Sequence, residues 1–234
     1  MESHDFLSAY DAHAAEYLIG VGSLIFFAFF WRYLNGAGPA EATVSVRDAV
    51  PEAASRMVEG FALPEALFFH PGHVWLRAEA DGVVAVGLDD FGHRLVGPMS
   101  GLRMPAVGAE VRQGEPTFAI EAGARQVELL SPVDGQVVAV NAQAQASPAE
   151  LAADPYGQGW LVKVKAPRLA ANLRQLLSGN AAQRWLEAAA EALRARLSPQ
   201  LGTVLQDGGT PVHGIARELD PQGWDALARS FFLT

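Results

Sequence analysis

The chain has 234 residues, half of them apolar, which is enough for one or two domains with a buried core. Its net charge of −9 argues against a nucleic-acid partner, because phosphate binding needs clustered basic side chains. Cysteine is absent, which excludes disulfides, thiolate nucleophiles and cysteine-ligated zinc or iron–sulfur centres in this chain.

The first predicted element is a membrane-spanning helix within the segment 1–34. Residues 18–31 are an uncharged apolar run, and extending it to 17–34 gives a helix of about 27 Å, close to the hydrocarbon thickness of a bilayer. Tyr17, Trp31 and Tyr33 lie at its ends, as interfacial aromatic residues do. The acidic leader argues against a cleaved signal peptide, and a buried core helix is the remaining alternative.

The orientation of this helix follows from the basic residues after it. Arg32 and Arg47 come next, so the positive-inside rule predicts a single-pass protein of the cell inner membrane. Its N-terminus would be periplasmic and its soluble part cytoplasmic. Phe29 and Phe30 in the apolar run are candidate contacts with other membrane subunits.

A linker and a strand-rich domain follow the predicted span. Residues 35–65 are a Gly/Pro/Ala linker and a short helix over 49–61 that begins near Pro51. The domain is predicted over 66–166. Its expected elements are a helical turn at 89–95, a short helix begun by the Ser147–Glu150 capping box, and strands at 74–77, 83–88, 116–121, 127–130, 136–140 and 159–165.

Several pieces of this domain match one family in order and spacing. The matching pieces are His73–Arg77, Val86–Phe91, Pro105–Pro116, Glu121, Ser131–Asn141 and Asp154–Leu161. Together they resemble the glycine cleavage system H protein, which implies a β-rich hybrid barrel-sandwich of the lipoyl and biotinyl type.

The resemblance also implies a lipoyl group on a lysine at a hairpin tip, three residues after the glutamate that matches Glu121. This chain has Ala124 at that position and Arg125 beside it. A guanidinium is not the primary amine that a lipoyl amide needs. The two lysines of the sequence, Lys163 and Lys165, match lysines of the terminal strand that the family does not modify. We therefore expect no cofactor, and no catalytic residue, in this chain.

The last segment, 167–234, is predicted to be a helical extension. Helices are expected over 169–177, over 181–197, after Ser198 and over 220–233, with a turn at 207–209. The aromatic residues near the C-terminus, Trp224, Phe231 and Phe232, either pack on the chain's own domain or anchor a partner subunit.

The six histidines give weak signals for a metal. His70 and His73 have a ligand-like spacing but no nearby carboxylate in the sequence, so a structural role is favoured and no metal is expected.

These observations predict a non-catalytic, membrane-anchored accessory or scaffold subunit. Its expected partners are integral membrane subunits and the lipid bilayer, and the expected assembly is a respiratory or photosynthetic electron-transfer complex. Arg125 is a further candidate partner contact. The alternatives are a lipoyl-type carrier or glycine-cleavage component, and a membrane sensor that binds a small ligand.

Overall fold

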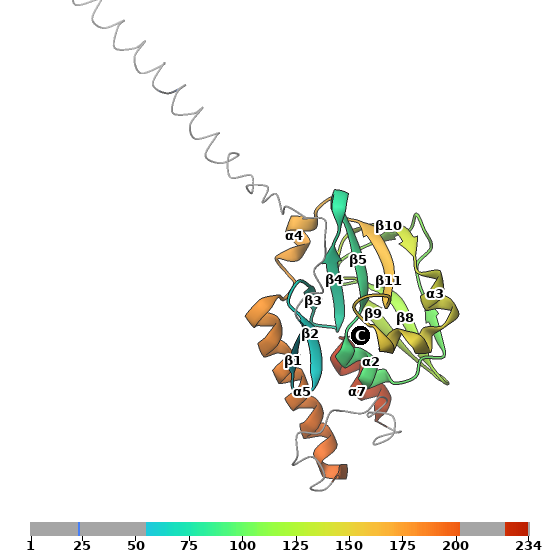
Figure 1. Ribbon diagram of the computed structural model, residues 1–234, viewed down its shortest axis with the longest axis vertical. Helices are drawn as coiled ribbons and strands as arrows, with labels where there is room; N and C mark the ends of the chain where they lie inside the picture. The colour runs from blue at the N-terminus through green and yellow to red at the C-terminus, as the bar shows by residue number, and fades with distance from the viewer. Residues whose placement is uncertain (1–22, 24–54, 202–222, 234) are drawn as a thin grey trace, which may run out of the picture. The chain divides into compact units, whose positions relative to one another are not determined.

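The computed structural model describes residue 23, residues 55–201 and residues 223–233 (Figure 1). All elements discussed below belong to one compact unit, Ser45–Thr234. The predicted membrane span, Phe29, Phe30 and the turn at 207–209 lie outside the described residues, so they stay predictions. No helix within the described ranges is long and apolar enough to cross a membrane.

Two antiparallel sheets form the body of the domain. The larger sheet has the strand order β3-β4-β5-β11-β10-β7, and the smaller has the order β6-β8-β9. The larger sheet consists of β3 (Phe68–His70), β4 (Val74–Ala78), β5 (Val83–Leu88), β7 (Glu110–Val111), β10 (Gly135–Val140) and β11 (Trp160–Lys165). The smaller consists of β6 (Gly101–Arg103), β8 (Pro116–Ala122) and β9 (Arg125–Leu130). The predicted β-rich architecture is confirmed in this part of the chain.

The core explains why β4 and β5 lie side by side. Trp75 is fully buried, and its indole N–H donates to the carbonyl oxygens of Leu88 and Pro155, each at 3.0 Å. Gly87 lies opposite Trp75 in the ladder, and a Cβ atom there would come within 2.5 Å of the indole ring. The bulky ring therefore requires a glycine on the neighbouring strand.

The predicted helix over 49–61 is wrong where the structure describes it. Strands β1 (Ser55–Val58) and β2 (Phe61–Pro64) form a hairpin instead. Glu59 and Gly60 connect the strands with φ of 52° and 87°, the pair of positive values that a type I′ turn needs. The turn holds Val58 and Phe61 against the core, where both are buried.

Helix α2 (Asp90–Val96) begins directly after β5, as the pattern at 89–95 predicts. The Asp89 carboxylate caps the helix by accepting a hydrogen bond from the Gly92 N–H at 2.7 Å. Phe91 and Leu95 on its inner face are buried in the core. The short 3₁₀ turn η1 (Ala80–Gly82) joins β4 to β5 at the other end of these strands.

Four further helical segments lie between β10 and residue 201. They are α3 (Ala142–Ala146), η2 (Pro148–Ala153), α4 (Leu169–Leu173) and α5 (Gly179–Leu201). The Ser147 side chain makes no capping hydrogen bond to η2, so the predicted capping box is wrong in that detail. A separate helix after Ser198 is also wrong, because α5 continues through that residue to Leu201.

The extension is attached to the edge of the larger sheet. Phe69 and Leu177 exchange two backbone hydrogen bonds of 2.8 Å between β3 and the segment joining α4 to α5. The last helix, α7 (Trp224–Phe232), lies next to α2 and contacts β9 (Figure 1). The family-like domain and the extension therefore share one apolar core.

Candidate functional site

The β8–β9 hairpin contains Ala124, the position at which the family resemblance implies a lipoyl lysine. Ala122 pairs with Arg125, so Gly123 and Ala124 form a two-residue loop. Gly123 has a φ of 65°, and Ala124 is not among the residues with positive φ, the pattern of a type II′ turn. The loop presents a methyl group, and no amine lies on any of these four residues.

Ser100, the residue before β6, holds this loop in place. The Ser100 N–H and hydroxyl both donate to the Glu121 carbonyl oxygen, at 2.8 and 3.1 Å. The Ser100 hydroxyl oxygen in turn accepts a hydrogen bond from the Gly123 N–H at 3.1 Å. The loop is therefore fixed by a serine 23 positions away in the sequence, a contact that no local pattern indicates.

Arg125 connects the hairpin to helix α7. Its guanidinium lies over the indole ring of Trp224 at 5.2 Å, and its Nε atom is 4.0 Å from a carboxylate oxygen of Asp225. The Arg125 side chain is 30% exposed, so part of it is available to a partner. The prediction that Arg125 contacts another protein stays untested, but its contacts within the chain are with the C-terminal helix.

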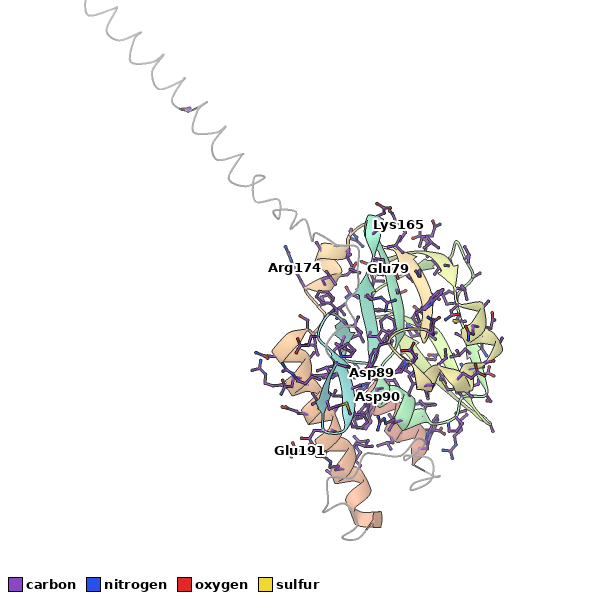
Figure 2. All side chains as sticks on the ribbon, viewed as in Figure 1. Glu79, Asp89, Asp90, Lys165, Arg174 and Glu191 are labelled. Carbon is purple, nitrogen blue, oxygen red and sulfur yellow. The ribbon has the colours of Figure 1, made fainter. Side chains whose placement is uncertain are left out.

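The two lysines lie on β11, not on the hairpin. Lys163 donates to a carboxylate oxygen of Glu79 at 2.7 Å and lies over the Trp160 ring. Lys165 donates to the backbone carbonyl of Asp81, beside the turn between β4 and β5. Figure 2 shows Lys165 and Asp90 toward opposite ends of the long strands. Both amines are therefore engaged by structural partners.

A buried polar pair lies at the start of α2. His73 Nδ1 and Asp89 Oδ2 are 2.9 Å apart, and both residues are almost fully buried. The His73 ring stacks on Phe91 at 4.2 Å and faces Trp185 at 4.7 Å. His73 also has a φ of 61°, which is costly for a residue other than glycine. This enclosed arrangement supports the predicted structural role for His73.

The predicted His70–His73 spacing does not produce a shared ligand set. His70 Nδ1 accepts a hydrogen bond from the Gly72 N–H at 3.0 Å, while His73 faces Asp89. Burial, followed by the nearby His73, lowers the pKa of His70. Within the described residues, no three histidine or acidic side chains are grouped as a metal site requires.

The C-terminal aromatic residues that the sequence marks for partner contact are buried in this structure. Trp224 is 1%, Phe231 9% and Phe232 0% exposed. Phe231 packs on Phe91, with 5.2 Å between ring centroids. Of the two interpretations, packing on the chain's own domain is the arrangement seen here, and contact with a partner subunit stays a prediction.

A polar hollow of about 510 Å³ is the place where a small ligand would be sought. Its two arginines have acidic neighbours: Arg168 donates to Asp134 at 3.0 Å, and Arg112 lies 3.8 Å from Glu115. A hydrogen bond from Asn172 is the largest cause of the lowered pKa of Asp134. Lys165, the third cation of the lining, donates to the backbone carbonyl of Asp81. The small-ligand alternative stays a prediction.

These features define a β-rich, lipoyl-type domain that has a short, rigid hairpin and a helical extension. A family model described as "Glycine cleavage H-protein" matches residues 67–189, more than half of the chain. The chain belongs to the glycine cleavage H-protein family.

Two relatives agree with this assignment in sequence. The chain is 37% identical to a probable glycine cleavage system H protein 2 of Saccharolobus solfataricus over 123 residues, 51% of this chain and 82% of that protein. It is 36% identical over 125 residues to the glycine cleavage system H protein of Cronobacter sakazakii, covering 53% and 96%. A crystal structure of the Mycobacterium marinum H protein aligns with a TM-score of 0.46 and 31% identity, covering 50% and 94%.

The family membership overturns two predictions. The chain was expected to be a membrane-anchored scaffold of an electron-transfer complex, with integral membrane subunits and the bilayer as partners. Its relatives are instead named as H proteins of the glycine cleavage system. The missing hairpin lysine had suggested a scaffold, but the sequence of the surrounding domain is that of the H-protein family.

Proposed function

We propose that this chain is a component of a glycine cleavage system that acts by protein contact. The H-protein domain binds the enzymes that recognise H proteins, and it has no catalytic centre of its own. One observation carries this proposal. The β8–β9 hairpin lies within the family's domain, but its loop contains Gly123 and Ala124, followed by Arg125, and no lysine.

The lipoyl group that the family implies does not fit this hairpin. An amide-linked arm needs a primary amine, and Ala124 offers a methyl group while the Arg125 guanidinium stacks on Trp224. Lys163 and Lys165 lie on β11, where Lys163 donates to Glu79 and Lys165 donates to the backbone carbonyl of Asp81. We therefore propose that the chain binds these enzymes without delivering an arm from its hairpin, and so occupies them in competition with lipoylated H proteins.

A reconstituted glycine cleavage system tests this function. With the lipoylated H protein of Cronobacter sakazakii as carrier, added full-length chain should inhibit glycine turnover, and more carrier should relieve the inhibition. The chain alone should support no turnover, and its intact mass after exposure to a lipoylating enzyme should show no adduct. Turnover supported by the chain alone, or no inhibition at large excess, would contradict the proposal.

A matched control separates surface recognition from general interference. Arg103 on β6 and Gln126 on β9 of the hairpin form a hydrogen bond of 3.3 Å, and Arg103 lies 3.7 Å from Glu121. The variant Arg103→Glu reverses a charge on this exposed surface and should weaken inhibition. Arg184→Glu reverses an exposed charge on α5, away from the hairpin, and should leave inhibition unchanged.

A further inference from the structure

Helix α7 is an addition to the family's domain. The family match ends at residue 189, whereas α7 begins at Trp224. Its apolar side is nevertheless buried on that domain, with Trp224, Leu227, Ala228, Phe231 and Phe232 removed from solvent. A nine-residue helix is too short to be stable alone, so its structure depends on the surface beneath it.

That surface has one end at the hairpin and the other at the β3–β4 turn. At the first end, Arg125 meets Trp224 and Asp225. At the second, the Phe232 carbonyl oxygen approaches Gly72 so closely that a Cβ atom there would lie 2.9 Å from it. Gly72 therefore admits the C-terminal turn of the helix, which a larger residue would obstruct.

Three elements line the surface between these ends. Phe91 on α2 and His73 before β4 face Phe231, with centroid distances of 5.2 and 6.1 Å. From α5, Arg196 donates to the Ser230 hydroxyl at 3.0 Å and lies 6.0 Å from the Phe231 ring. Strand β9 forms the remaining side. We call this surface, lined by Gly72, His73, Phe91, Arg125 and Arg196, the α7 groove.

Three features of the contact between α7 and the groove are unfavourable or weak. The Trp224 indole N–H is buried and has no acceptor among the described residues. The helix ends at Leu233 in the left-handed conformation, with a φ of 62°, and that side chain is 53% exposed. The ion pair of Arg125 and Asp225 is long and partly solvated, so it contributes little. Apolar contact and the Arg125–Trp224 contact hold α7 in place, and these defects favour its exchange.

We infer that the α7 groove is a binding surface for an amphipathic helix of a partner protein, which α7 occupies in cis. The partner helix would present aromatic residues along one face and an acidic residue in its first turn, facing Arg125, as α7 does. If the chain binds glycine cleavage enzymes as proposed above, α7 controls their access to the hairpin side of the H-protein domain. Only this consequence rests on the proposed function. The groove itself is testable without any glycine cleavage enzyme.

The first test uses a peptide of residues 223–233 as the probe, added to full-length protein. The variant Phe231→Ala loses the contact with Phe91 and should release α7, so it should bind the labelled peptide about ten-fold more tightly than the wild-type chain, in which the groove is occupied. Leu176→Ala removes a buried side chain in the segment between α4 and α5 and should leave peptide binding at the wild-type level. A peptide with both phenylalanines and the tryptophan changed to alanine is the probe control.

The second test locks the helix in place and compares two forms of one variant, so any weakening by the substitutions is common to both. The chain has no cysteine, so Arg125→Cys with Asp225→Cys gives a unique pair for a short bismaleimide cross-link. The matched control is the same protein with both thiols capped singly. The capped form should bind the peptide, and the cross-linked form should not. Equal binding by the two forms, or none by the capped form and Phe231→Ala, would overturn the inference.

The same proteins distinguish this inference from the proposed function. Phe231→Ala should inhibit reconstituted glycine cleavage more strongly than the wild-type chain, and the cross-linked form more weakly. Peptide binding without any inhibition would leave the groove established and reject the proposed function. Inhibition that is identical in the locked and capped forms would show that the enzymes bind elsewhere, which rejects the control of access by α7.

Discussion

The guanidinium carbon of Arg125 lies 5.2 Å from the centre of the Trp224 ring, although the two residues are almost a hundred positions apart in the sequence. This contact joins the end of the β8–β9 hairpin to the first turn of the C-terminal helix. The hairpin end is therefore not a free projection. It is one wall of an intramolecular interface, which gives the residue beside the loop a role in holding the helix.

The first prediction concerns this contact. Arg125→Ala removes a cation–π interaction of about 1 kcal/mol, so opening of α7 should become roughly five-fold more frequent. Hydrogen exchange of the α7 amides should accelerate by that factor, while the amides of β5 and β11 keep their rates. Arg103→Ala is the matched control, because it removes an exposed arginine from the same sheet. Unchanged α7 exchange in Arg125→Ala would show that apolar packing alone holds the helix.

A second prediction restores an amine to the hairpin. Ala124→Lys should make the chain a substrate for a lipoylating enzyme, because the loop is rigid, short and well presented by Ser100. Intact-mass measurement should show the addition of one lipoyl group. The enlarged side chain lies in the loop, so folding stability should change by less than about 1 kcal/mol.

Gln126→Lys is the control for this gain of modification. It places a lysine two residues away, on an exposed position of β9. Modification of Ala124→Lys alone would identify position 124 as the attachment position. Modification of both variants would mean that any exposed lysine near the loop suffices, and modification of neither would show that α7 or other features block the lipoylating enzyme.

The third prediction is about folding stability. Asp89 caps α2 through one carboxylate oxygen and pairs with buried His73 through the other. Asp89→Ala should lower the free energy of unfolding by about 2–4 kcal/mol, because the cap is lost and a buried imidazole loses its partner. Asp89→Asn keeps an oxygen for the cap and should cost less. Urea denaturation measures both, with the exposed Glu128→Ala as a control expected within about 0.5 kcal/mol of wild type.

The strands of the larger sheet were accessible to sequence reasoning because each is marked locally. Alternating apolar residues predict β11 at 159–165, and the Asp81–Gly82 pair predicts the close of the β4–β5 hairpin. The β1–β2 hairpin was missed although Gly60 marks its turn, because Pro51 and the surrounding alanines favour a helix. Two short strands are stabilised mainly by their contacts with the core. The local sequence does not record those contacts, because the core residues are distant in the chain.

The candidate site was only half accessible. The hairpin and its missing amine are visible in the sequence, but the interface with α7 joins Arg125 to Trp224 and Gly72 to Phe232. No periodicity records which face of the domain a terminal helix will cover. The helix itself was predicted from its apolar spacing. Its aromatic residues pack on the chain's own domain, and their contact with a partner subunit stays a prediction.

The last prediction concerns alkaline pH. The Tyr156 hydroxyl donates to the Ala62 carbonyl at 2.7 Å and accepts from the Asp90 N–H at 3.0 Å. Burial, followed by repulsion from Asp89, raises its pKa well above the ordinary value of 10.0. Above that value the unfolded chain releases the tyrosine proton and the folded chain keeps it. Stability should therefore fall as the pH rises from about 10 toward the folded-state pKa.

Urea denaturation at about pH 8 and about pH 11 measures this effect. The variant Tyr156→Phe should be less stable by about 1–3 kcal/mol at the lower pH, because Ala62 and Asp90 each lose a hydrogen-bond partner in the interior. At the higher pH the difference between the two proteins should shrink, since the wild-type chain alone pays the cost of keeping a protonated phenol. A constant difference would mean that Tyr156 ionises in the folded protein as easily as in the unfolded chain, and that its enclosure by β2 and α2 is looser than the two hydrogen bonds indicate.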